Sequence, residues 1–118
     1  MSDLRPWPLE LKVRRADKTL SLAFDTGETF VLPAEYLRVN TPSAQDRGHG
    51  GERRTVSGKQ GVGITDVRPV GRYAARIVFD DGHDTGLYSW DALYDLARGQ
   101  ERKWAVYLQE LTDKGLKR

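Results

Sequence analysis

The segment from Phe79 to Leu93 constrains the fold of this chain most, because it predicts a strand, a tight turn, a second strand and a helix in immediate succession. Its Asp81-Gly82 pair is a strong signal for a two-residue hairpin turn between antiparallel strands. Ser89 suits the N-cap of a helix, and Asp91 places a negative charge in the first helical turn, where the helix dipole favours it. The segment therefore predicts a hairpin that leads directly into a helix.

A weaker copy of this layout occurs earlier in the chain. Phe24-Asp25-Thr26-Gly27 matches Phe79-Asp80-Asp81-Gly82, and residues 32–37 match residues 87–93 with one residue inserted. Two copies are too few for a solenoid of stacked repeats. We therefore predict one α+β domain over residues 1–118, built of two small antiparallel β-sheets or one bent sheet, with short helices and a C-terminal helical pair.

Alternating apolar residues predict the remaining strands. They span residues 9–15, 19–24, 28–32, 61–70 and 73–79, with a turn at 68–72. In the first strand, Leu9, Leu11 and Val13 are expected on the inner face.

Helical spacing predicts a short helix over residues 33–38 that begins at Pro33, a second helix between Ser89 and Gly99, and a third over residues 100–114. The third helix is expected to turn one apolar stripe towards the core, formed by Trp104, Tyr107, Leu108 and Leu111. Residues 1–8 and 41–58 are predicted to be flexible, since prolines, glycines and polar residues dominate them.

Composition excludes several classes of protein. The chain has no cysteine, which rules out thiolate metal sites and cysteine nucleophiles within it. Its 19 basic and 17 acidic side chains nearly balance, and the basic ones are scattered, so we expect no nucleic-acid partner. We expect no signal segment and no membrane span, and hence a cytoplasmic protein.

The order of motifs resembles that of the gamma-butyrobetaine hydroxylase N-terminal-like family, formerly a domain of unknown function. The resemblance rests on Gly71-Arg72-Tyr73-Ala74 and on the string D-G-H-x-x-G-x-Y-x-W-x-x-L within residues 79–93, and it covers about residues 9–98. In the hydroxylases of carnitine synthesis such a domain precedes a 2-oxoglutarate/iron catalytic barrel. In some iron–sulfur carrier ATPases it is appended, and in many bacteria it stands alone. We expect the stand-alone form, since the chain lacks the His-x-Asp…His set that would bind the oxygenase iron.

The resemblance also implies a metal site. In the hydroxylases the domain resembles a small zinc module with three cysteines and one histidine. That histidine falls on His83, whereas the cysteine positions fall near Thr41, Ser43 and Asp46, so a thiolate site is lost. His49 lies close to Asp46 in sequence, so His83, His49 and Asp46 remain as a set that suits zinc or iron. The alternative for His83 is a turn residue whose ring bonds to a neighbouring backbone group or to an acid such as Asp84 or Asp80.

Three functions stay open at this point. The first is a non-enzymatic binding or adaptor module that acts on an iron enzyme or an iron–sulfur assembly factor through a patch of His83, Tyr88 and Trp90. A homodimer is compatible with it, and the alternative for both aromatic residues is a place in the core. The second is a small metal-binding protein. The third is an enzyme with acid/base residues in 80–84, for which hairpin turn chemistry is the competing interpretation.

The metal hypothesis predicts a measurable stoichiometry. Protein purified without a histidine tag and supplied with zinc or iron should retain close to one metal ion per chain in elemental analysis, because a genuine site binds near stoichiometrically. A content below about a tenth of an ion per chain would reject the site.

Overall fold

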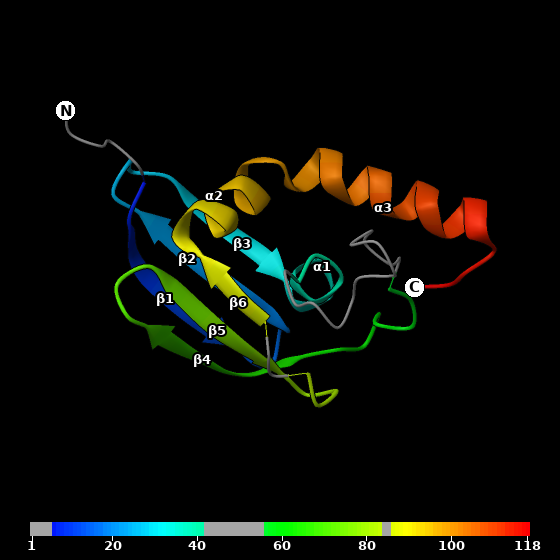
Figure 1. The fold of residues 1–118 in the computed structure, drawn as a ribbon, viewed down its shortest axis with the longest axis horizontal. Helices are drawn as coiled ribbons and strands as arrows, with labels where there is room; N and C mark the ends of the chain where they lie inside the picture. The colour runs from blue at the N-terminus through cyan, green and yellow to red at the C-terminus, as the bar shows by residue number, and fades with distance from the viewer. Residues whose placement is uncertain (1–5, 42–55, 84–85) are drawn as a thin grey trace.

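The computed structural model describes residues 6–41, 56–83 and 86–118, which form an α+β fold of two three-stranded antiparallel sheets and three helices (Figure 1). The first sheet has the order β1 (Pro8–Arg14), β2 (Thr19–Phe24) and β3 (Thr29–Pro33), and it leads into helix α1 (Ala34–Val39). The predicted α+β fold is confirmed, and of the two predicted arrangements the structure has two sheets and not one bent sheet.

The second sheet repeats this plan. Its order is β4 (Ile64–Val70), β5 (Ala74–Phe79) and β6 (Gly86–Ser89), and it leads into helix α2 (Trp90–Arg98). Helix α3 (Gln100–Lys114) follows and crosses the top of the view in Figure 1, which completes the predicted C-terminal helical pair. None of the helices in these described ranges is long and apolar enough to cross a membrane.

One hydrophobic core joins the two halves, because both sheets and all three helices pack side chains against it. The central strands contribute its middle, where Leu20, Phe24, Ile77 and Phe79 are at most 2% exposed. Complete burial of such a side chain stabilises a fold by about 1.5–3 kcal/mol. Each sheet therefore depends on the other for the cover of its apolar face.

The matching tetrapeptides form matching turns. In each turn the glycine N–H donates to the phenylalanine carbonyl, from Gly27 to Phe24 at 3.0 Å and from Gly82 to Phe79 at 3.3 Å. Both glycines have left-handed backbone angles, with φ of 91° and 92°, which residues with a Cβ rarely adopt. The repeat seen in the sequence is thus a repeat of backbone geometry.

The aspartate that follows each phenylalanine makes equivalent hydrogen bonds in both halves. The Asp25 N–H donates to the Trp7 carbonyl at 2.8 Å, and the Asp25 carboxylate accepts from the Trp7 N–H at 3.0 Å. Asp80 makes the same pair of bonds with Gly63, both at 2.9 Å. Each aspartate thereby fastens the segment before the first strand of its sheet to the central hairpin.

Several local predictions are wrong, and the reasons are physical. Leu9 is 69% exposed because a bulge between Pro8 and Glu10 shifts the register of β1 against β2. Residues 68–70 remain paired in β4, so the turn is confined to residues 71–73. Pro33 ends β3 and caps α1 instead of occupying its first position.

The C-terminal helices follow their predicted signals closely. The Ser89 hydroxyl accepts from the Ala92 N–H at 3.0 Å, and Gly99 separates α2 from α3. In α3, Tyr107 and Leu111 are buried, whereas Leu108 is 37% exposed, so the core-facing stripe is narrower than predicted.

The segments predicted to be flexible lie partly outside the described residues. Residues 1–5 and 42–55 are not described. Within the described part, Pro8 begins β1 and Trp7 bonds to Asp25, so the end of the predicted leader belongs to the sheet. The Val56 carbonyl accepts from the Tyr107 hydroxyl at 2.7 Å, which attaches the end of the long connection to α3.

The repeated aspartate leads to a stability prediction. Asp80→Ala should destabilise the protein by about 1–3 kcal/mol, because the buried Gly63 N–H loses its carboxylate acceptor. Asp80→Asn retains an oxygen at the same place and should cost less. Urea unfolding of both variants at neutral pH tests this, and equal losses would show that the hydrogen bond is not the cause.

Candidate functional site

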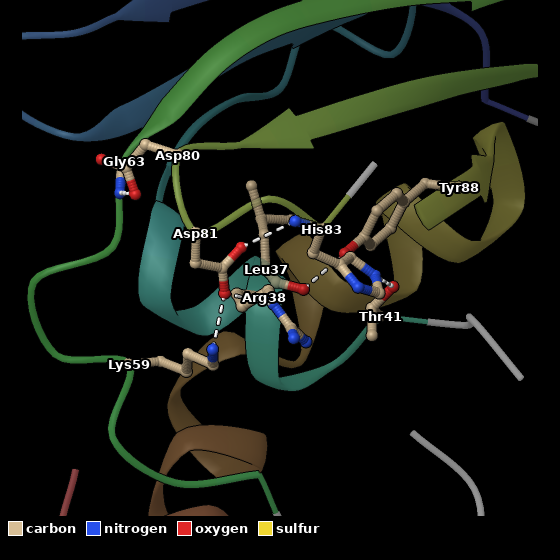
Figure 2. A network of polar contacts seen from close by, with 9 residues as sticks. All are labelled: Leu37, Arg38, Thr41, Lys59, Gly63, Asp80, Asp81, His83 and Tyr88. Carbon is tan, nitrogen blue, oxygen red and sulfur yellow. Dashed lines mark hydrogen bonds and ion pairs between the residues drawn. The ribbon is translucent and has the colours of Figure 1, made fainter. Parts of the chain in front are cut away.

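A network of polar contacts lies where the β5–β6 connection meets α1 (Figure 2). Its centre is the Asp81 carboxylate. One oxygen, Oδ2, accepts from Arg38 Nε at 2.9 Å and from Lys59 Nζ at 2.6 Å, and the other, Oδ1, accepts from the His83 N–H at 3.0 Å. Three separate segments of the chain therefore meet at one carboxylate.

The environment keeps Asp81 ionised. Partial burial by itself would raise the pKa of Asp81, but the hydrogen bonds from Lys59, the His83 N–H and Arg38, together with the Arg38 charge, outweigh it and lower the pKa to about 2. The Asp81 side chain is 18% exposed and that of Arg38 is 8% exposed, so the ion pair is largely shielded from water. A carboxylate with so low a pKa is a weak general base at neutral pH.

His83 is buried beside this network, with 7% of its surface exposed. Its ring Nε2 lies 3.2 Å from the Thr41 hydroxyl, and its ring centroid lies 6.0 Å from that of Phe79. The sequence predicted a bond from the ring to a backbone group or an acid, but the contact described here is with a threonine hydroxyl, and the Asp80 carboxylate accepts from the Gly63 N–H. Asp84, the other expected partner, lies outside the described residues.

Only part of the predicted metal set can be placed. Asp46 and His49, as well as Ser43, lie outside the described residues. Within residues 6–41, 56–83 and 86–118 no group of three or more metal-ligating side chains comes together. Thr41, the first position that the resemblance relates to a family cysteine, does contact His83.

Tyr88 is a core residue, which is the alternative interpretation of its aromatic ring. It is 0% exposed and pairs with Ala75 across the β5–β6 ladder. Its hydroxyl donates to the Leu37 carbonyl at 2.5 Å, so its polar end is used to hold α1 against the second sheet. Tyr88 cannot touch a partner's surface in this state, and the predicted patch of His83, Tyr88 and Trp90 is corrected accordingly.

Trp90 is the one predicted patch residue at an accessible place. Its indole N–H donates to the Arg72 carbonyl at 2.7 Å, and its ring meets that of Trp7 edge to face at 6.1 Å. Trp7 and Tyr73 are 45% and 59% exposed, and both line with Trp90 a surface hollow of about 390 Å³. We call Trp7, Tyr73 and Trp90 the aromatic patch.

The sequence interpretation missed Trp7 and Tyr73 as surface residues. Trp7 stands between two prolines in a segment predicted to be flexible, and Tyr73 opens the strand predicted over residues 73–79. The position of Tyr73 in the 71–73 turn explains its exposure, because the residue precedes β5. The tryptophan in this polar segment was a signal that the segment contacts the folded domain, since such a side chain seldom remains fully in water.

Comparison with known proteins places the chain in a family. The model of the gamma-butyrobetaine hydroxylase-like, N-terminal family matches residues 11–94. The chain belongs to this family. A search of curated proteins found no match.

Three solved structures are similar to this domain over most of its length. Two solution structures determined by NMR are each 44% identical to this domain: one covers 96% of the chain with a TM-score of 0.85, the other 100% with 0.83, and 90% of each is covered in return. A crystal structure of a protein with unknown function from Acidithiobacillus ferrooxidans is 35% identical, with a TM-score of 0.69, and covers 81% of this chain and 98% of its own. That protein belongs to the former domain of unknown function 971.

The Asp81 network predicts a pH-dependent stability. Because the pKa of Asp81 is lower in the folded domain than in the unfolded chain, the ionised carboxylate stabilises the fold above pH 4 or so, and the contribution is lost as the pH falls from about 4 towards 2. Asp81→Asn should therefore lower the free energy of unfolding by about 1–2 kcal/mol at pH 7, with a smaller loss near pH 2. Urea unfolding at both pH values measures this.

Asp66→Asn serves as the control, because Asp66 pairs with Arg68 at 2.7 Å on an exposed surface. It should change stability less than Asp81→Asn at pH 7. A loss for Asp81→Asn that is the same at both pH values would contradict the role of its charge.

Proposed function

We propose that this domain is a non-catalytic binding module that acts as an adaptor for an iron enzyme or an iron–sulfur assembly factor. The observation that carries the proposal is that the polar side chains of the turn are bonded within the fold, while large aromatic side chains are exposed elsewhere. Asp80, Asp81 and Tyr88 are engaged in bonds that hold the fold, whereas Trp7 and Tyr73 of the aromatic patch face solvent. The chemistry of the turn is structural, and the accessible surface is of a type that binds other proteins.

The aromatic patch has the features of a protein-binding surface. Tyrosine and tryptophan are enriched at interfaces, since each supplies a large rigid area with a polar end. The patch is firm, because the Trp90 indole is tied to the Arg72 carbonyl and its ring supports Trp7. Arg72 and Asp91 line the same hollow and supply charges of both signs at its edge.

The proposed class of partner rests on what the family resemblance implies. The resemblance implies that similar domains precede 2-oxoglutarate/iron hydroxylase barrels or are appended to iron–sulfur carrier ATPases. We infer that this domain acts on such proteins in trans. Fusion in one protein and association of two proteins use the same kind of surface, and interfaces between fused domains resemble transient interfaces between proteins.

A metal-binding protein is the second candidate. The observation in its favour is the contact between His83 Nε2 and the Thr41 hydroxyl, because it sets the histidine next to the residue from which the chain continues towards Asp46 and His49. The residues chemically suit zinc or ferrous iron as two imidazoles and a carboxylate.

The adaptor function predicts specific losses of affinity. An oxygenase or iron–sulfur carrier ATPase encoded beside the gene should bind the purified domain in calorimetry. Trp7→Ala and Tyr73→Ala should each weaken that binding roughly tenfold or more, as for truncated aromatic hot spots. Val106→Ala is the matched control, since Val106 is 53% exposed on α3, outside the aromatic patch.

Unchanged affinity in both folded aromatic variants would reject the patch. The absence of binding to candidates of both classes at tens of micromolar, roughly the weak end of transient complexes, would reject the adaptor function itself.

A further inference from the structure

A second cavity lies between α1 and α3, separate from both the Asp81 network and the aromatic patch. Its volume is about 640 Å³, and its lining includes Glu35 and Tyr36 from α1 and Trp104 from α3. The segment that follows α3 turns back beneath that helix (Figure 1) and brings Arg118 into the lining.

Glu35 is an unusual residue in this cavity, because it is a carboxylate that is only 6% exposed. Both of its oxygens accept from one guanidinium: Oε1 from Arg118 Nη2 at 2.8 Å and Oε2 from Arg118 Nε at 3.1 Å. This is the forked, two-bond geometry that a planar guanidinium makes with a carboxylate and that an ammonium group cannot make.

An aromatic face completes the surroundings of the guanidinium. The Arg118 Cζ lies 5.3 Å from the centroid of the Trp104 ring, within the range of a cation–π interaction. Tyr36 supports the indole edge to face at 6.3 Å, and the Tyr36 hydroxyl is fixed by the Leu96 carbonyl at 2.6 Å. The wall that recognises the cation is therefore part of the rigid core.

The arginine itself lies on the irregular segment that follows α3. Gly115 ends α3 with a left-handed φ of 67°, and residues 116–118 have no regular structure. The Arg118 side chain is 43% exposed although its partner Glu35 is buried, so water and other solutes reach the guanidinium from one side. A buried carboxylate on a fixed helix, paired with a cation on an irregular segment, is the arrangement of a receptor and a tethered ligand.

We propose that the Glu35–Trp104 cavity is a binding site for an arginine side chain of a protein partner, and that Arg118 occupies it in cis. An arginine from outside must compete with a tethered one, whose effective concentration is high. Removal of the Arg118 guanidinium opens the site to the same chemical group in trans. The proposal does not depend on the aromatic patch, since the two surfaces share no lining residue.

Competition between the tethered and the free guanidinium provides the test. The probe is acetyl-arginine amide, titrated into wild type and into Arg118→Ala while the indole N–H signal of Trp104 is followed by NMR. Arg118→Ala should bind the probe at least tenfold more tightly than wild type does. Acetyl-lysine amide should bind Arg118→Ala at least tenfold more weakly than the arginine probe, because it cannot form the fork.

The double variant Glu35→Gln/Arg118→Ala separates the carboxylate from the rest of the cavity. Glutamine retains the shape of the Glu35 side chain but not its charge. The double variant should therefore bind the arginine probe at least tenfold more weakly than Arg118→Ala does. The indole signal of Trp90, on the other surface, should not move in any titration. Dispersed amide spectra establish that both variants are folded.

Two results would overturn the proposal: equal binding of the arginine probe by the single and double variants, or equal binding of arginine and lysine probes by Arg118→Ala. If the single variant does not fold, the wild type still decides the matter. Saturating probe must then shift the Trp104 indole signal of the wild type, and the absence of any shift rejects the site.

Discussion

The fold depends on one constraint: a three-stranded sheet followed by one short helix cannot cover its own apolar face. Each half of this domain is such a unit, and the two central strands carry side chains that are almost fully buried. Association of the two sheets removes both apolar faces from water at once, which is the largest favourable term in folding. The β1–β4 contact and the three helices then close the main core around residues from both halves.

Polar groups in this domain mostly connect elements that the core alone would leave loosely oriented. The Tyr36 hydroxyl reaches the Leu96 carbonyl of α2, and the Tyr88 hydroxyl reaches the Leu37 carbonyl of α1, so each half is bonded to the helix of the other. Asp81 adds a third connection through Arg38 and Lys59. The side chains of the turn, such as Asp81, thus hold elements of the domain together, since a buried polar group must find a partner.

The accessible chemistry lies elsewhere, on two surfaces of different character. The aromatic patch offers area and rigidity, which suit a broad protein contact. The cavity between α1 and α3 offers one buried carboxylate and one aromatic face, which suit a single planar cation. A binding module with both surfaces would combine an extended contact with a specific anchor.

The sequence by itself determined the local structure. Period-two and helical patterns, the glycine turns and the Ser89 cap each act within a few residues, and the repeated Phe-Asp-x-Gly motif correctly predicted two similar halves, while the longer string within residues 79–93 indicated the family. Only the tertiary structure decided which side chains are accessible. Tyr88 and His83 are buried against α1 and the residues just after it, which are distant in sequence, while a bulge exposes Leu9 and a turn exposes Tyr73. The pairing of Glu35 with Arg118 joins residues 83 positions apart, and no local pattern encodes such a contact, because it depends on how the helices pack.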